Sequence, residues 1–205
     1  PSPAAHADIV TTTAHKTLRG PRPGLIMGRE QHAKAINKSV FPGLQGGPHM
    51  HTIAAKAVAL KEAAQPEFAA YARQVVVNAK ELSKSLEAHG FTIVAGGTDC
   101  HLLVVDLRPA GVTGKDAQAL LDKVGITGNK NTVPFDPQPP TVCSGVRLGT
   151  PALTTRGMQA ADMREVAELI TRTIKSGGDE QALAKIRADV EQLSRRFPLY
   201  AHRLR

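Results

Sequence analysis

The stretch TTTAHKTLRGPRPG, Thr11–Gly24, decides the fold of this sequence because it places one lysine between two short strand signals. The β-branched run Ile9–Thr13 predicts a strand, the following Gly–Pro pair predicts a reversal of the chain, and Gly24–Met27 predicts a second strand. Lys16 is thus expected at a strand end, with two arginines close by in the turn. A lysine held among cations loses its proton more easily, and the neutral amine forms Schiff bases with carbonyl compounds. A solvated loop lysine is the alternative interpretation.

Length and composition describe a globular chain without metal or membrane signals. With 205 residues, 41% of them apolar, it can bury one sizeable core, or one domain and part of another. Cys100 and Cys143 stand far apart, with no paired CxxC motif and no histidine at zinc spacing, so no metal site is expected. No apolar run approaches the length of a membrane span, and no secretory signal opens the sequence. We therefore expect a soluble, cytoplasmic protein.

The positive charge is concentrated in the first third of the chain. The net charge is +8, and residues 1–60 carry seven Lys or Arg against only Asp8 and Glu30. Such a segment suits a small anionic ligand bearing a phosphate or a carboxylate. Nucleic acid is the alternative partner, but the sequence has no block of basic residues, no Trp and only seven aromatic residues to stack on bases. We expect a small-molecule site, with no nucleic acid and no membrane partner.

A glycine-rich segment, Phe41–Pro48, follows a short helix predicted over Arg29–Val40. Gly46 and Gly47 stand directly before Pro48, a residue that suits the first turn of a helix, and a helix is predicted over Pro48–Gln65. A loop that leads into a helix in this way directs backbone N–H groups outward and can bind an anion. A tight turn with no ligand is the alternative.

The remaining residues predict a mixture of helices and strands, which is typical of an α+β domain. We place the domain boundary near Gln65, giving domains 1–65 and 66–205. The predicted helices are a long one from Pro66 to a stop at Gly90, one starting at the capping sequence Thr113–Asp116, and two closing ones that include Met163–Ile174 and Leu183–Phe197. The predicted strands are Phe91–Ala95, His101–Leu107, Ile126–Val133 and Val146–Leu148, with a proline-rich loop, Pro134–Pro140.

Arg147 is the second candidate functional residue. It lies between Gly145 and Gly149 at the end of a short strand, so little side-chain bulk surrounds it. A planar guanidinium can hold a carboxylate through two parallel hydrogen bonds. An ordinary surface ion pair is the alternative.

Together these segments resemble serine hydroxymethyltransferase, a family of pyridoxal-phosphate enzymes. The resemblance is carried, in the family's order, by HADIVTTTAHKTLRGPRPG (6–24), VFPGLQGGPHMH (40–51), KAVALKE (56–62), GGTDCHLLVVD (96–106), NKNTV (129–133) and SGVRLGTPALTTRG (144–157). It implies an α/β, aspartate aminotransferase-like fold, the fold type I of pyridoxal-phosphate transferases. Residues 1–65 would be the C-terminal part of the large cofactor-binding domain, and residues 66–205 the small α+β C-terminal domain.

The resemblance also implies a role for each candidate. Lys16 would bind pyridoxal 5'-phosphate covalently and Arg147 would bind the carboxylate of serine or glycine. The other implied contacts are Thr13, His15 and Arg22 for the cofactor, Gly46 and Gly47 for the cofactor phosphate of a neighbouring subunit in a homo-oligomer, and Asn131, Pro139, Pro140 and Thr141 for tetrahydrofolate.

The implied reaction transfers the hydroxymethyl group of serine to tetrahydrofolate, giving glycine and 5,10-methylenetetrahydrofolate. Pro139 and Thr141 stand where the family usually has serine and phenylalanine, so we expect weak folate binding. Full-length members are about twice as long, and the family's cofactor-protonating acid and stacking histidine belong to the other half. We therefore expect this chain to be a C-terminal half that is inactive without its N-terminal half. The alternative is a truncated, non-catalytic module that associates with a full-length partner.

Overall fold

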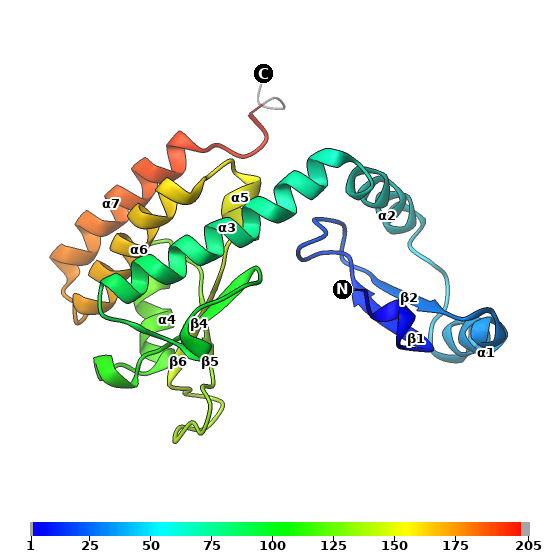
Figure 1. Cartoon of the computed structure of the whole chain (residues 1–205), viewed down its shortest axis with the longest axis horizontal. Helices are drawn as coiled ribbons and strands as arrows, with labels where there is room; N and C mark the ends of the chain where they lie inside the picture. Colours follow the sequence, from blue (N-terminus) through cyan, green and yellow to red (C-terminus); the bar gives the residue numbers. More distant parts are fainter. Residues whose placement is uncertain (1, 202–205) are drawn as a thin grey trace. The chain divides into compact units, whose positions relative to one another are not determined.

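The computed structural model describes residues 2–201, and these residues form two compact units (Figure 1). The first unit extends to Ala70 and the second begins at Tyr71. Helix α3, Pro66–Ala88, crosses this division. The domain boundary expected near Gln65 lies directly before this helix.

The first unit is built on an antiparallel strand pair, β1 (Ile9–Thr13) and β2 (Gly24–Gly28). Thr13 lies opposite Gly24 and Ile9 lies opposite Gly28, so residues 14–23 form the connection. The predicted strands and the reversal between them are confirmed.

Two helices complete the first unit, α1 (Ala33–Lys38) and α2 (Met50–Ala63). The single helix predicted over Arg29–Val40 is wrong in extent. A 3-10 turn precedes α1, and an irregular turn, Ser39–Leu44, follows it and contains Pro42, which has no N–H for a helical hydrogen bond. Helix α2 begins two residues later than predicted, because His49 has an extended backbone conformation.

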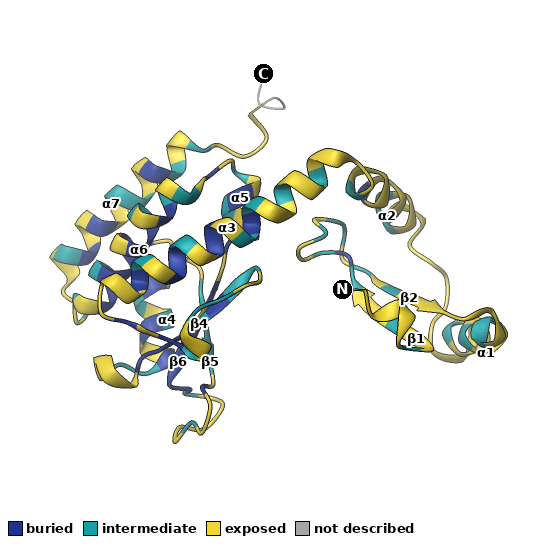
Figure 2. Ribbon diagram, in the orientation of Figure 1, coloured by how far each residue is buried: buried dark blue, intermediate teal, exposed yellow. Residues whose placement is uncertain are grey.

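Little of the first unit is buried. Among its described residues, Ala14 and Ala59 are the buried apolar side chains, whereas Ile26, Met27, Met50 and Val58 are each at least 49% exposed. Figure 2 shows the same contrast, because dark blue residues concentrate in α3 and in the elements that follow it.

The second unit contains an antiparallel sheet with the strand order β3-β4-β6-β5. The strands are β3 (Thr92–Ile93), β4 (Leu102–Asp106), β5 (Asn129–Asn131) and β6 (Gly145–Gly149). Leu103 lies opposite Leu148 and Val105 opposite Val146, so these buried side chains share one face of the sheet. The four predicted strands are confirmed, although β3, β4 and β5 are shorter than predicted and β6 is longer.

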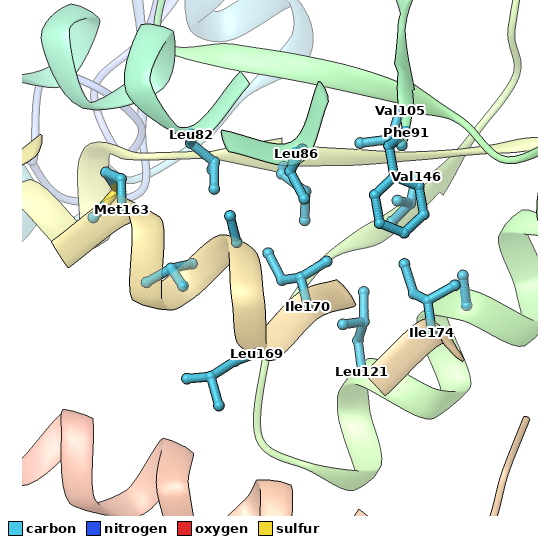
Figure 3. Close-up of a cluster of buried hydrophobic side chains, with 14 of the residues drawn as sticks. Leu82, Leu86, Phe91, Val105, Leu121, Val146, Met163, Leu169, Ile170 and Ile174 are labelled. Atoms are coloured by element: carbon cyan, nitrogen blue, oxygen red, sulfur yellow. The ribbon is translucent and has the colours of Figure 1, made fainter. Parts of the chain in front are cut away.

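Helices pack over the apolar face of this sheet and close the core. They are α3, α4 (Gly114–Lys123), α5 (Pro151–Thr155) and α6 (Ala160–Lys175), and α7 (Glu180–Arg196) packs against α6. Figure 3 shows Leu82 and Leu86 of α3 approaching Met163 and Ile170 of α6, with Leu121 of α4 beside them. No helix of the described residues is long and apolar enough to cross a membrane.

Side chains fix the starts of three of these helices. The Thr113 hydroxyl accepts a hydrogen bond from the Asp116 N–H at 3.1 Å and donates one to the Asp116 carboxylate at 2.6 Å, so the predicted start of α4 is confirmed. Gln159 and Asp162 form a capping box at α6, and Asp179 accepts from the Ala182 N–H at α7. These last two caps and the five-residue helix α5 were not predicted.

Candidate cofactor and substrate sites

The connection that carries Lys16 is closed by its own backbone. The Ala14 N–H donates to the Pro23 carbonyl at 3.1 Å, the Gly20 N–H donates to the Ala14 carbonyl at 2.7 Å, and the Arg19 N–H donates to the Lys16 carbonyl at 2.9 Å. Lys16 lies within this closed loop with its side chain exposed. A fixed backbone with an exposed amine suits a lysine that reacts with a ligand.

Gly20 fastens this loop to helix α2. A Cβ at Gly20 would lie 2.9 Å from the Ala14 carbonyl oxygen and 3.1 Å from the Ala59 Cβ. Both neighbours are buried. Only glycine allows this close approach, so the loop and the helix hold the segment around Lys16 together.

The other residues predicted to contact the cofactor lie on or beside the same loop. Thr13 is the half-buried last residue of β1, and Arg22 is exposed near the far end of the loop. His15 is half-buried, and its Nδ1 is buried without a hydrogen-bond partner among the described residues. A buried ring nitrogen without a partner is a group that a bound ligand or water would satisfy.

Gly46 and Gly47 lie in a separate loop of the same unit. Both are exposed, and a Cβ at either position would meet no atom within 4 Å. The loop enters α2 at Met50. Their role in binding a phosphate stays a prediction.

Arg147 occupies the middle of β6, an interior strand of the sheet. Its neighbours Val146 and Leu148 are buried in the core, whereas Arg147 is exposed on the opposite face. Among the described residues, its guanidinium forms neither an ion pair nor a side-chain hydrogen bond. The alternative interpretation, an ordinary surface ion pair, therefore has no partner carboxylate among these residues.

Asn131 shares the exposed face with Arg147. Asn129 lies opposite Arg147 and Asn131 lies opposite Gly145, and alternate residues of a strand share a face. The Asn131 amide donates to the Thr132 carbonyl at 2.7 Å. The sheet thus brings together two residues that were predicted for different ligands.

Asp136 organises the loop between β5 and β6. Its carboxylate accepts hydrogen bonds from the N–H groups of Val133, Gln138 and Ser144 at 2.8–3.1 Å, and from the Ser144 hydroxyl at 2.6 Å. Burial acts to raise the pKa of this carboxyl, but the Ser144 hydroxyl and the three N–H groups together lower the pKa well below its ordinary value. Asp136 is therefore ionised at neutral pH, and it joins the two ends of the loop.

Pro139, Pro140 and Thr141 lie inside this loop and are exposed. The Pro139 carbonyl accepts from the N–H groups of Val142 and Cys143, and the Cys143 carbonyl accepts from the Gly114 N–H at the start of α4. The exposed segment is thus anchored at its base on a helix.

Sequence reasoning missed Asp136 and Ser144 as organising residues. An aspartate directly before a proline, within a loop that contains further prolines, is typical of a side chain that caps its own turn, and this signal could have identified Asp136. The described residues contain no group of His, Cys, Asp or Glu side chains that could hold a metal ion.

Comparisons with known proteins agree on one family. The family model for serine hydroxymethyltransferase matches residues 1–170. The chain is 58% identical over 205 residues to a serine hydroxymethyltransferase of Myxococcus xanthus, covering all of this chain and 49% of the relative. It is 53% identical over 200 residues to one of Acidobacterium capsulatum, covering 98% of this chain and 47% of that relative. The chain spans about half the length of these curated relatives.

Proposed function

The chain belongs to the serine hydroxymethyltransferase family, and we propose that it supplies the cofactor lysine, the substrate arginine and the folate loop of such an enzyme. The family has the fold type I of pyridoxal-phosphate transferases, and the helices and antiparallel sheet described above are consistent with it. The proposed reaction moves the hydroxymethyl group of serine to tetrahydrofolate, within a homo-oligomer.

The residues around Lys16 fit pyridoxal phosphate. An exposed amine on a fixed loop can react with the aldehyde of the cofactor, and the buried, unpartnered Nδ1 of His15 leaves a polar group for it to satisfy. Thr13 and Arg22 would contact the cofactor beside Lys16, and Gly46 and Gly47 would offer backbone N–H groups to a phosphate. When bound, the cofactor acts as an electron sink for the amino-acid substrate.

Arg147 would bind and orient the amino acid. Its fork-shaped guanidinium is exposed on the sheet and has no protein carboxylate among the described residues, so it is available for two parallel hydrogen bonds to a substrate carboxylate. Binding the carboxylate of the amino acid restricts the orientation of the substrate, and such positioning increases the reaction rate.

The Asp136 loop would contact the folate. Asn131 offers an amide on the same face as Arg147, and the exposed segment Pro139–Thr141 rises from a base that Asp136 holds. Thr141 supplies a small polar side chain rather than an aromatic ring, so we expect the apolar contact with the folate to be weak.

The observation that carries the proposal is the closed loop that presents Lys16. The test is reduction of the protein with borohydride after incubation with pyridoxal phosphate, followed by peptide mapping. We expect Lys16 to be modified far more than Lys34 and Lys38, two exposed lysines of the same unit that no such loop holds. Lys16→Arg should remove the preferred modification and leave the weak modification of the other lysines.

Equal modification of the three lysines in folded protein would reject Lys16 as the cofactor lysine. A second measurement separates cofactor binding from turnover. The protein with bound cofactor is titrated with serine, and a change in cofactor absorbance on adding serine reports substrate binding even where no product forms.

A further inference from the structure

A cavity of about 270 Å³ lies among β6, α5, α6 and α7 of the second unit. Its wall is predominantly apolar and includes Leu82, Leu148, Leu153, Ile170 and Leu193. An apolar cavity of about 150 Å³ in another protein accepts benzene. The present cavity therefore has room for a six-membered ring with a short side chain.

Arg156 is the one charged residue in the described wall of this cavity. It is half-buried at the end of α5, and its Nη2 donates to the Ser194 carbonyl at 2.9 Å. Within residues 2–201 its buried Nε has no hydrogen-bond partner, and no carboxylate there forms an ion pair with it. A partly buried cation without a counter-charge is costly, so this arginine offers binding energy to an anion.

The cavity opens into a basic groove. Gly125, Arg156, Val190 and Ser194 line both the cavity and the groove, which has a volume of about 570 Å³. Of the residues that the structure describes, four basic and two acidic ones line the groove.

Of the two acidic residues of the groove, Glu191 forms ion pairs, whereas Asp122 forms none with the described residues. Glu191 is shared by Arg187 at 3.4 Å and Arg195 at 3.8 Å, and Lys123 is paired with Glu180 at 2.8 Å. An anion that enters from the groove would thus meet excess positive charge and reach Arg156.

We propose that this cavity binds a small monocarboxylate with an apolar body, such as an aromatic ring or a short hydrocarbon chain. The carboxylate pairs with Arg156 at the opening and the apolar body lies among the leucines. A neutral ligand would bind less well because it would leave the Arg156 guanidinium without an anion. A small hydrophilic anion would bind less well because it would not cover the apolar side chains of the wall. Leu148 and Arg147 point to opposite faces of β6, so this site is separate from the substrate arginine.

Calorimetric titration of the unchanged protein with three probes tests the proposal. Phenylacetate carries both the ring and the charge, phenylacetamide carries only the ring, and acetate carries only the charge. We expect phenylacetate to bind one molecule per chain and at least tenfold more tightly than either other probe, because a hydrogen-bonded charge pair and the buried ring both contribute. Equal affinity for phenylacetate and phenylacetamide, or no binding of phenylacetate, would overturn the proposal.

Variants then locate the site. Arg156→Gln should weaken phenylacetate binding at least tenfold, and Leu153→Phe should abolish it by filling the cavity. Arg164→Gln is the matched control, because Arg164 is paired with Glu81 outside the cavity and its loss should change nothing. Unchanged binding in folded Arg156→Gln and Leu153→Phe would overturn the site. If either variant fails to fold, the three-probe comparison on the unchanged protein still decides.

One further variant separates this proposal from the proposed enzyme function. Arg147→Lys should leave phenylacetate binding intact, since Arg147 does not line the cavity. Loss of binding in Arg147→Lys would place the ligand at the substrate arginine and reject the cavity.

Discussion

Single side chains with unusual partners distinguish the candidate sites of this chain. Arg147 stands on an interior strand without a carboxylate among the described residues, whereas Asp136 accepts four hydrogen bonds from three residues. The first is available for a ligand, and the second holds a loop. We therefore expect substitution of Arg147 to affect ligand binding and substitution of Asp136 to affect stability.

Arg147→Lys should weaken serine binding by roughly ten- to a hundredfold. A lysine keeps the positive charge but loses the two parallel hydrogen bonds of the guanidinium, at a cost of about 1.5–3 kcal/mol. The measurement is the dissociation constant for serine in cofactor-loaded protein, followed by absorbance. Arg187→Lys, at an exposed ion pair on α7, is the control. An unchanged constant in Arg147→Lys would remove Arg147 from the substrate site.

Asp136→Asn should destabilise the protein in a pH-dependent manner. The pKa of Asp136 is lowered in the folded protein from its ordinary value of 3.8, so the ionised carboxylate contributes stability above that value. The contribution is lost as the pH falls below 3.8 towards the lowered pKa. The difference in unfolding free energy between the original protein and Asp136→Asn should therefore be largest near neutral pH and shrink in acid.

Denaturant unfolding at a series of pH values measures this difference. Asp99→Asn is the control, because Asp99 is exposed and makes no side-chain hydrogen bond or ion pair with the described residues. If the difference in unfolding free energy between the original protein and Asp136→Asn stays constant as the pH falls, the hydrogen bonds around this carboxylate do not depend on its charge.

Among the elements, the loop between β5 and β6 joins a rigid base to an exposed segment. Asp136 and the start of α4 hold the base, and Pro139–Thr141 lie in solvent. A change in the exposed segment should therefore alter ligand contacts with little effect on stability.

Thr141→Phe should tighten tetrahydrofolate binding. It adds an aromatic surface to the segment proposed to lie against the folate, and aromatic contacts contribute about 0.5–1.5 kcal/mol beyond the area they bury. The affinity for tetrahydrofolate is measured by titration in the presence of glycine. Thr92→Phe, at an exposed position on the edge strand β3, should not change it. If the original protein binds folate as tightly as Thr141→Phe, the proposed contact at this residue is wrong.

Elements with a regular pattern could be predicted from the sequence. The β-branched run Ile9–Thr13, the long helix from Pro66 and the Thr113 cap are local signals, and the structure confirms them. The interruption after α1 and the five-residue helix α5 were missed, because short elements carry too few periodic positions to be recognised.

The candidate sites were predictable only in part. The position of Lys16 shortly after β1 followed from local sequence, whereas Arg147 was expected at the end of a strand and lies in the middle of β6. The hydrogen bonds of Asp136 depend on Ser144, eight residues later, and the unpaired state of Arg156 depends on what packs around it. Such properties arise from tertiary contacts that no sequence window contains.

In the whole molecule, burial differs sharply between the two units. The hydrophobic core lies entirely within the second unit, whereas Ala14 and Ala59 are the buried apolar residues described in the first. Local opening is easiest where few apolar contacts oppose it. The first unit is therefore expected to be the less stable of the two.

Limited digestion with trypsin should remove the first unit before the second. Lys16, Arg19 and Arg29 are exposed there and none of them precedes a proline, so cleavage sites are available. We expect a resistant fragment that begins between Lys61 and Arg73, identified by mass spectrometry over a time course. Bound pyridoxal phosphate should slow cleavage at Lys16. Equal rates of cleavage throughout the chain would contradict a difference in stability between the units.

The division within α3 also affects the order in which the protein is made. Residues 1–70 are synthesised before the 135 residues from Tyr71 to Arg205, and at about 5–20 residues per second these 135 residues need roughly 7–27 s. During that interval the exposed apolar side chains of the first unit, Ile26 and Met27 on β2 and Met50 and Val58 on α2, are present before the core of the second unit has formed. Apolar surface that is exposed during synthesis favours association between chains, so we expect chaperones to bind the first unit while the second is being made.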